Sequence, residues 1–567
     1  MRKLFTYVLV AAAAMAGFTS CSDDNNDPQL FELPAESKTM TPSNGLTFVS
    51  NGQSLSDVTL QYVPAADGKS AILDIFGSNA SRAASRAESP VIAPGDVLPG
   101  AASVSINVTP KFEADRATFE GDAESTYCTF HYDGTITATT IQVNFTNIVM
   151  KNGVIISTLT FTDADVDHML ELTYNGAPLM GKTVSFKPDA SDFKRAVLTL
   201  AGQALDLTDL LATAQLPVDL SKLSKIQTPG VIPGTSSFEL PVVLGDDNAF
   251  SGSAETAFVT FNYEGQVASE KLVFNITEAK LKNAPLSENK WYVPHYFYNE
   301  DTWEYEGNPV HFVWESSAKF NIDLGGLVLP FQPADLVGIM LQMGLIPQDD
   351  NETASITQMI SRSLKTIEFH PDGNIIAGYV ENGKVGGPVI QSPAGLAQYV
   401  IASDGTLLLY LNPQAIIMNV MKAQNEAAKS RAIDFSKYQA TIDGLAEMLA
   451  RCVSEGFPIT YANGIYKAAT EEGEDREFIN TDDNLSVYAN TEFILPILKA
   501  VAPIFNDEEV RQTIMNLAGQ NEDFAAMAPM LDGILKSVPD VVEGTTKIEA
   551  GIILTKNEPI VSETTAE

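Results

Sequence analysis

The stretch of sequence that decides the fold occurs twice in the chain. Residues 119–134 read FEGDAESTYCTFHYDG and residues 250–265 read FSGSAETAFVTFNYEG, so that half of the positions are identical in register. In both copies apolar and polar residues alternate around the Thr-Phe-x-Tyr segment, a pattern typical of half-buried antiparallel strands. The repeated pattern therefore predicts two domains that are built from the same strands.

The match continues upstream, over more than 100 residues in total. Residues 51–64 (NGQSLSDVTLQYVP) correspond to residues 175–188 (NGAPLMGKTVSFKP), and the VLPG of residues 97–100 corresponds to the VIPG of residues 231–234. A strand-like segment recurs about every 8–12 residues, with Gly, Asn or Asp turns between segments, which is typical of β-sandwiches.

The two copies differ mainly in one loop. Residues 79–89 are small and polar in the first copy, whereas residues 205–225 of the second copy carry leucines at a spacing that predicts a short helix. Local differences in binding are expected at this loop. We expect tandem β-sandwich repeats over residues 44–153 and 168–284.

From residue 287 onward the pattern changes to strands that are interrupted by helices. Pro371-Asp372-Gly373 and Asp404-Gly405 each separate two apolar runs, which indicates two hairpins. Apolar residues at helical spacing predict helices over residues 435–452, 491–502, 507–518 and 521–536. We therefore expect a mainly β chain whose residues 287–558 form a mixed α+β domain, an antiparallel barrel or sheet with helical insertions.

The N-terminus has the layout of a secretory signal. Two basic residues precede an apolar run over residues 4–17, which is followed by small residues and Cys21. The run is shorter than the roughly 20 residues that a transmembrane helix needs. Residues 1–20 are therefore expected to be removed as a signal peptide, and the polar residues that follow predict a flexible tether over residues 21–43.

A cysteine at this place makes the segment resemble the signal of bacterial lipoproteins. The resemblance implies that Cys21 carries acyl chains such as palmitate, which anchor the protein to a membrane. The acidic residues 22–28 (SDDNNDP) resemble the surface-export signal of Bacteroidota lipoproteins. Lys290-Trp291 and the hairpins after it make the C-terminal region similar to the lipocalin-like domains of uncharacterised lipoproteins from that phylum. Together these resemblances imply a lipid-anchored outer-membrane protein that is exposed at the cell surface.

The charge balance argues against one class of partner. The chain carries 35 Lys and Arg against 72 Asp and Glu, a formal net charge of −37. A field of this sign repels phosphate backbones, so nucleic acid is not an expected partner. After Cys21 no segment approaches 18 uninterrupted apolar residues, which argues against a membrane-spanning helix.

The other two cysteines, Cys128 and Cys452, fall in a strand-like and in a helix-like segment. We expect both to be buried, small apolar side chains rather than redox groups.

The three tryptophans, Trp291, Trp303 and Trp314, lie within 24 residues of one another. Trp291 and Trp314 fall in strand-like runs, where a large aromatic side chain usually belongs to the core. Both are therefore expected to be buried.

Trp303 and Tyr305 flank a turn that the sequence predicts at residues 306–308, and exposed aromatic side chains there would form a stacking platform for a sugar or another flat ligand. Glu304 and Glu306 are expected to supply hydrogen bonds to this ligand. The alternative is that the aromatic residues belong to the core of a hairpin.

Asp163, Asp165 and Asp167 lie between the two repeats, and carboxylates at alternate positions could bind calcium. However, the sixth position of this segment is His168 and the twelfth is Tyr174, whereas an EF-hand loop has Gly and Glu there. A solvated linker is the better interpretation, and no metal is expected.

No catalytic motif occurs in the chain. The five histidines have no metal-ligand spacing, and the nucleophile elbow, the zinc-protease helix and the nucleotide-binding loops are all missing from the sequence. A carboxylate pair for glycoside hydrolysis stays open, because its geometry comes from the fold. We expect no cofactor and a protein that is not an enzyme.

Three functions are compatible with the sequence. The first is a non-enzymatic surface lipoprotein in which the repeats act as a spacer and the C-terminal domain binds a ligand, such as a glycan. The second is a lipocalin-like carrier of a small apolar ligand. The third is a structural or adhesive lipoprotein that binds another protein.

Overall fold

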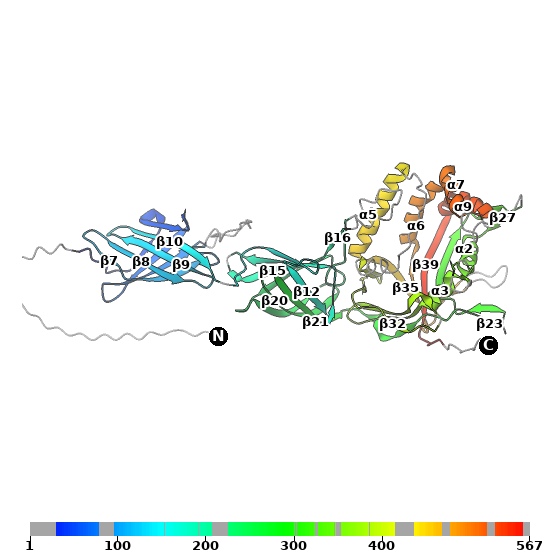
Figure 1. Ribbon diagram of the computed structural model, residues 1–567, viewed down its shortest axis with the longest axis horizontal. Helices are drawn as coiled ribbons and strands as arrows, with labels where there is room; N and C mark the ends of the chain where they lie inside the picture. Colours follow the sequence, from blue (N-terminus) through cyan, green and yellow to red (C-terminus); the bar gives the residue numbers. More distant parts are fainter. Residues whose placement is uncertain are drawn as a thin grey trace, which may run out of the picture. The chain divides into compact units, whose positions relative to one another are not determined.

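The computed structural model describes residues 30–559, except residues 79–95, 152, 191, 207–224, 300, 302, 324–326, 345, 348–352, 385, 414–435, 468–476 and 519–527. The signal peptide, Cys21 and most of the helix expected over residues 205–225 lie outside the described residues. The chain divides into two compact units, Met1–Asn152 and Gly153–Glu567. The expectation of a mainly β chain is confirmed (Figure 1).

The first unit contains two β-sheets that share one core. Their strand orders are β1-β4-β5-β6 and β3-β2-β10-β9-β8-β7. Alternate residues are buried, as in β4, where Val58, Leu60 and Tyr62 face the core. Buried side chains of both sheets form a single cluster. The elements are β1 (Lys38–Met40), η1 (Pro42–Asn44), β2 (Leu46–Ser50), β3 (Gln53–Ser54), β4 (Val58–Pro64), β5 (Ala71–Gly77), β6 (Ser103–Val108), β7 (Lys111–Phe112), β8 (Ala117–Glu124), β9 (Cys128–Ile136) and β10 (Ile141–Met150).

The second unit begins with a nine-stranded sheet. Its strand order is β18-β15-β14-β11-β12-β21-β20-β19, and β13 pairs with β12. The end strands β18 and β19 contact each other, so the sheet is a nearly closed barrel. The nine strands are β11 (Leu159–Thr162), β12 (Met169–Tyr174), β13 (Ala177–Pro178), β14 (Lys182–Asp189), β15 (Asp192–Gly202), β18 (Ser237–Val243), β19 (Ala249–Glu255), β20 (Val259–Val267) and β21 (Lys271–Leu281). β16 (Ala204–Asp206) and β17 (Lys225–Gln227) pair only with each other.

The strands of the two copies pair in the same order. In both copies an early strand runs parallel to the last strand, β2 beside β10 and β12 beside β21. One difference is that β11 pairs with both β14 and β12, and it thereby joins two sheets that stay separate in the first copy. β1 and β11 lie outside the boundaries expected from the sequence, because strands of three or four residues carry too short a pattern to be recognised.

The C-terminal half contains a closed antiparallel barrel of eight strands, which confirms the barrel expected there. Its strand order is β22-β30-β31-β33-β34-β35-β38-β39, and β22 closes the barrel where Tyr292 pairs with Thr555. β25 pairs along the rest of β39. The eight barrel strands are β22 (Lys290–Tyr292), β30 (Leu364–Phe369), β31 (Asn374–Val380), β33 (Ala397–Ile401), β34 (Leu407–Leu411), β35 (Phe457–Asn463), β38 (Asn484–Ala489) and β39 (Thr545–Thr555). The strands beside the barrel are β23 (Phe297–Asn299), β24 (Glu304–Glu306), β25 (Val310–Ser316), β26 (Phe320–Asp323), β27 (Val328–Phe331), β28 (Ile346–Pro347), β29 (Thr353–Ala354), β32 (Val389–Gln391), β36 (Ile465–Lys467) and β37 (Glu477–Ile479).

Helices are inserted between these strands (Figure 1). α3 begins at a capping box, in which Ser355 Oγ accepts a hydrogen bond from Gln358 N and the Gln358 side chain accepts one from Ser355 N. α9 packs against β26 and shares a small second core with it. The helices are η3 (Pro285–Glu288), α2 (Pro333–Gln342), α3 (Ile356–Ser363), η5 (Glu381–Gly383), η6 (Ser436–Tyr438), α5 (Gln439–Glu455), α6 (Thr491–Val501), η7 (Ala502–Asn506), α7 (Glu508–Ala518) and α9 (Ala528–Glu543).

The second copy and the barrel contact each other at the turn between β30 and β31. Tyr174 Oη donates a hydrogen bond to the Asp372 carbonyl (2.8 Å), and Asn175 Nδ2 donates one to the Asp372 carboxylate (3.2 Å). Leu281 N donates to the carbonyl of Pro371 (2.8 Å). These bonds make the second copy and the barrel one compact unit.

Candidate functional site

The hairpin of β23 and β24 presents aromatic side chains at the surface. Trp303 is 80% exposed and Tyr305 is 52% exposed, and their neighbours Phe297 and Tyr298 are also exposed. Tyr298 lies opposite Tyr305 in the antiparallel register. We call these four residues the aromatic hairpin. Their exposure agrees with the sequence-based expectation for Trp303 and Tyr305, whereas contact with a ligand stays a prediction.

Tyr305 is anchored by a buried neighbour. Its ring stacks on that of Tyr296, with centroids 5.0 Å apart and planes inclined by 11°, and it meets the edge of Tyr298. Tyr296 is buried, and burial together with Tyr305 raises the pKa of Tyr296 to about 12. Tyr305 therefore has a defined orientation although half of it is exposed.

The turn of the hairpin differs from the one that the sequence predicts. Glu304–Glu306 is a strand, and the chain reverses before it, where Trp303 has a φ of 60° and donates its N–H to the carbonyl of Asn299 (2.8 Å). The Asn299 side chain accepts a further hydrogen bond from Asp301 N (2.9 Å). A positive φ is unfavourable for a bulky residue and costs about 1–3 kcal/mol. The hydrogen bonds of Asn299 hold Trp303 in this conformation.

The strand register separates the residues of the expected sugar site. Glu306 pairs with Phe297, and position 304 pairs with Asn299, whereas Tyr305 pairs with Tyr298. Neighbouring residues of a strand point to opposite faces. Positions 304 and 306 therefore belong to one face of the hairpin and Tyr305 to the other. The structure does not bring Glu306 to the face of Tyr305, and Glu306 instead accepts a hydrogen bond from Asn299 Nδ2 (2.7 Å).

The other two tryptophans lie in cores. Trp291 is 2% exposed within the barrel core. Trp314 is half-buried against Phe320, and its Nε1 donates to Thr545 Oγ1 (2.9 Å). Both positions agree with the sequence-based expectation.

The inner face of the barrel has one level of fully buried apolar residues and a next level that is partly buried. Four of its strands carry a buried apolar residue and, two residues away, a half-exposed one that packs against the same core. Because residues two apart share one face of a strand, both sets point inward. These pairs of buried and half-exposed residues are Phe369 and Ile367, Leu407 and Leu409, Leu485 and Val487, and Leu554 and Ile552. On β35, Ile459 and Tyr461 are both half-exposed.

The inner face of the closed barrel therefore carries apolar residues that are only partly buried. Eight-stranded barrels have interiors that either are filled by side chains or hold one small ligand. The sequence analysis did not identify this lining, although its alternation of apolar residues is visible in the strands.

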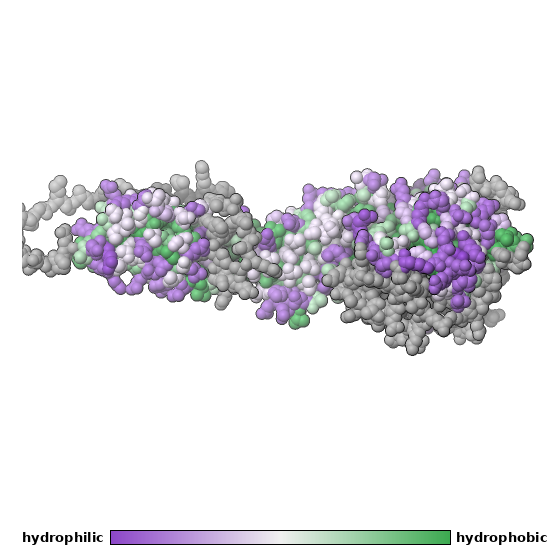
Figure 2. Space-filling model, turned by 90° about the horizontal axis from the view of Figure 1, so that it is seen from above, coloured by the Kyte–Doolittle hydropathy of each residue, from purple (hydrophilic) through white to green (hydrophobic). Residues whose placement is uncertain are grey.

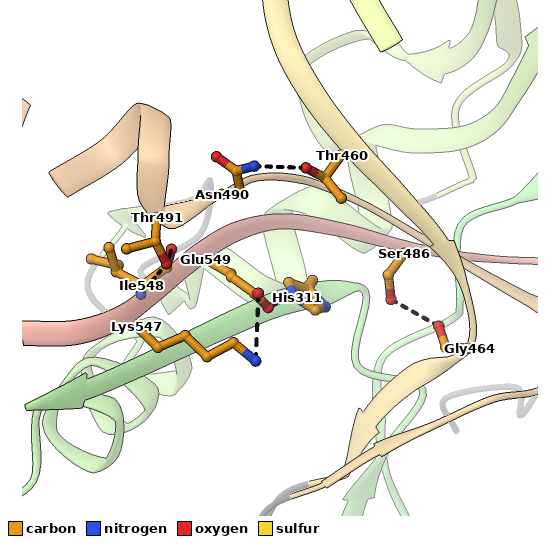
Figure 3. A network of polar contacts seen from close by, with 9 residues as sticks. All are labelled: His311, Thr460, Gly464, Ser486, Asn490, Thr491, Lys547, Ile548 and Glu549. Atoms are coloured by element: carbon orange, nitrogen blue, oxygen red, sulfur yellow. Dashed lines mark hydrogen bonds and ion pairs between the residues drawn. The ribbon is translucent and has the colours of Figure 1, made fainter. Parts of the chain in front are cut away.

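A cluster of polar side chains lies where β25, β38 and β39 meet (Figure 3). His311 is fully buried, stacks on Tyr488 with centroids 4.2 Å apart, and shares a hydrogen bond of 3.0 Å between its Nε2 and Glu549 Oε2. Lys547 Nζ lies 3.4 Å from the other carboxylate oxygen. Burial raises the pKa of Glu549, but the hydrogen bond with His311 and the charge of Lys547 outweigh it and leave this pKa below its ordinary value.

His311 Nδ1 is buried and has no hydrogen-bond partner in the described part of the chain. His311 and Glu549 are 238 residues apart in the sequence, so no local motif could have predicted their contact. We interpret the cluster as structural.

The aspartates near residue 165 do not converge on one point. Asp163 Oδ2 accepts a hydrogen bond from Gly181 N (3.0 Å), whereas Asp165 Oδ1 accepts from the backbone N–H groups of Asp167 and His168. These backbone hydrogen bonds lower the pKa of Asp165. Over the described residues, no group of three or more His, Cys, Asp or Glu could hold a metal ion. The segment connects β11 to β12 within the second copy.

A shallow pocket of about 430 Å³ lies at the junction of the second copy and the barrel. It is lined by Asn175, Thr277, Glu278, Ala279, Lys280, His370, Pro371 and Asp372. Its polar groups include those that connect the two domains, so we interpret the pocket as part of the contact between these domains.

Cys128 and Cys452 are buried, as expected, and neither forms a disulfide.

Comparisons of the chain with protein-family models, with curated proteins and with solved structures found no match.

Within the described residues, every helix is too short or too polar to cross a membrane. Hydrophilic residues predominate on the face shown in Figure 2, and exposed apolar residues form small, separate groups on it.

Proposed function

We propose that this chain is a non-enzymatic, lipid-anchored surface protein that binds a saccharide through the aromatic hairpin. The observation that carries the proposal is the exposure of four aromatic side chains on one short hairpin. Large aromatic side chains usually bury their surface, so an exposed group of them is typical of a binding site. Sugar rings offer flat C–H faces that pack on aromatic rings.

The fixed conformation of the aromatic hairpin supports this proposal. Tyr305 is fixed by its stacking on Tyr296, and hydrogen bonds to Asn299 fix the turn at Trp303. A binding surface that is already ordered loses less conformational entropy when the ligand binds.

The anchor and the domain architecture belong to the same proposal. The lipoprotein-like signal supports acylation at Cys21 and an outer-membrane location. Equal strand orders support a tandem of related modules over the expected ranges 44–153 and 168–284. The two sheets of the first copy agree with the expected β-sandwich, whereas the second copy departs from it, because β11 joins its strands into one nearly closed sheet. The sequential order of the barrel strands supports a lipocalin-like domain over residues 287–558.

Substitutions in the hairpin test the proposal. A glycan array first identifies a ligand of residues 22–567. Trp303→Ala is then expected to weaken the binding of that ligand about tenfold, because one stacked ring contributes on the order of 1 kcal/mol. Trp303→Phe keeps a ring and should retain most of the affinity. Tyr305→Ala should also weaken binding, with a small loss of stability because its stacking on Tyr296 is lost.

The thermal midpoint controls for unfolding. Trp303 is 80% exposed, so Trp303→Ala should leave the midpoint unchanged. A variant that binds as tightly as the wild type, or an array without any ligand, would refute saccharide binding at the hairpin.

A second candidate function is the transport of a small apolar ligand in the barrel. The half-exposed inward residues Leu409, Ile459, Tyr461, Val487 and Ile552 favour it. A fluorescent fatty acid should bind, and Val487→Trp should reduce this binding severalfold by filling the interior. Val243→Trp serves as the control, because Val243 is 69% exposed on the second copy. Equal binding by both variants would contradict a site inside the barrel.

A further inference from the structure

Basic side chains gather where α3 ends beside the aromatic hairpin. Ser361 Oγ accepts a hydrogen bond from Tyr296 N (2.8 Å) and donates one to the carbonyl of Pro294 (3.0 Å). Lys365 Nζ donates to the carbonyl of Ser361 (2.9 Å), and Val293 N donates to the carbonyl of Lys365 (2.9 Å). These bonds hold the segment that leads into β23 against the C-terminal end of α3.

His295 lies in this segment and connects the basic residues to the aromatic ones. Its ring stacks on that of Phe297, with centroids 5.7 Å apart and planes inclined by 17°. Burial lowers the pKa of His295, and the charges of Lys365 and Arg362 lower it further. Burial and the charge of Arg362 likewise lower the pKa of Lys365. The basic groups are therefore close enough to repel one another.

No carboxylate offsets this repulsion. Among the described residues, His295, Arg362 and Lys365 form no ion pair with Asp or Glu. Some lysines elsewhere in the chain do pair with acids, as Lys194 does with Asp246. Uncompensated like charges beside an exposed aromatic surface indicate a place for a negatively charged group.

We infer that the saccharide is acidic, with a sugar ring against Phe297, the residue of the aromatic hairpin that stacks on His295, and its carboxylate at Arg362 and Lys365. This inference rests on the proposed function and names its ligand class. A guanidinium group pairs with a carboxylate through two parallel hydrogen bonds.

A purely structural role of the basic residues makes a different prediction. Arg362 lies in the last turn of α3, where a positive charge stabilises the helix dipole. Its substitution would then lower stability but would not change the preference between acidic and neutral sugars. The decisive measurement is therefore ligand selectivity.

The experiment compares two ligands of equal length, an oligogalacturonate and its methyl ester, by titration calorimetry on residues 22–567. The acid should bind about tenfold more tightly than the ester, because only the acid gains charged hydrogen bonds. Arg362→Gln and Lys365→Gln should each weaken the binding of the acid severalfold and leave the ester unchanged. Lys499→Gln removes a charge from the exposed face of α6 and should change neither affinity.

The possible outcomes separate the two proposals. If acid and ester bind equally, or if the variants keep the preference for the acid, the inference is wrong while saccharide binding stands. If inorganic phosphate displaces the acid at equal concentration, the site is a general anion site and the inference is also wrong. If neither ligand binds, and Trp303→Ala has no effect on any glycan of the array, the proposed function fails as well.

Discussion

Lys182 shows how one residue can distinguish two otherwise similar copies. It is 1% exposed at the start of β14, and its Nζ donates to the carbonyls of Pro229 (2.8 Å) and Gly230 (3.0 Å). Val58 has the same place at the start of β4 in the first copy. Burial lowers the pKa of Lys182 to about 7, although the charge of Asp163 opposes this shift. The neutral amine still has two N–H groups for the two carbonyls.

We predict that the second copy becomes more stable as the pH rises from 7 to 9.5. The unfolded chain keeps its proton on Lys182 up to the ordinary value of 10.5, whereas the folded chain releases it near pH 7. Stability rises with pH wherever the unfolded state binds more protons, by at most about 1.4 kcal/mol per pH unit for one group. Urea midpoints measured across this range report the change.

Lys182→Val places the residue of the first copy in the second copy and removes the titrating group. Its urea midpoint should change less with pH than that of the wild type, and other groups that titrate in this range cancel in the comparison. Identical pH dependences for the two proteins would contradict a lowered pKa of Lys182.

Some residue-level features could be predicted from the sequence and others could not. The exposure of Trp303 and Tyr305 was predicted from a cluster of aromatic residues beside a turn, although the hairpin reverses before Glu304 and not at residues 306–308. The basic cluster was not predictable, since Arg362 and Lys365 approach His295 only after α3 has packed against the segment that precedes β23. Contacts of this kind depend on tertiary structure and leave no local pattern.

At the scale of elements, Gly307 determines how the aromatic hairpin joins the barrel. Its φ is +72°, and a Cβ atom added there would lie 1.9 Å from the carbonyl oxygen of His295. Gly307→Ala should therefore displace β24 from the segment before β23. We expect a loss of at least 2 kcal/mol in the local stability of the hairpin, roughly the sum of backbone strain and steric overlap. Hydrogen exchange of the β24 amides measures it.

Gly386 provides a matched control. It also has a φ of +72°, but a Cβ atom added there would meet nothing within 4 Å. Gly386→Ala should show the backbone cost alone, about 1 kcal/mol. If both variants lose equal protection, the contact between Gly307 and His295 does not fix the hairpin.

The elements also show why sequence patterns predict some segments better than others. The helices expected over residues 491–502 and 507–518 correspond closely to α6 and α7, because their apolar residues recur at helical spacing. α9 continues through Pro539 to Glu543, beyond the expected end at residue 536. Packing against β26 supports this last part of α9, which a proline would otherwise disfavour.

At the scale of the whole molecule, the side chain of Asn175 links the second copy to the barrel by a hydrogen bond. Asn175 Oδ1 accepts a hydrogen bond from Ala279 N (2.9 Å), and its Nδ2 contacts the Asp372 carboxylate across the junction. Asn175→Ala should destabilise the second unit by about 1–3 kcal/mol and separate the unfolding of its two domains. Calorimetric scans should then show an additional transition.

Asn51 has the equivalent position in the first copy, with a φ of 50° against 48° for Asn175. Asn51→Ala therefore carries the same backbone cost in the other unit and should leave the second unit unchanged. An unchanged transition of the second unit in Asn175→Ala would show that the tyrosine and main-chain contacts suffice at the junction.

The fully buried level of the barrel core limits where a ligand could enter and leave the barrel. Trp291 and its buried neighbours fill the barrel core near the turn that contacts the second copy. If the barrel carries a small molecule, uptake and release must therefore both take place at its other end. A partner that receives this molecule would have to approach the barrel from that end.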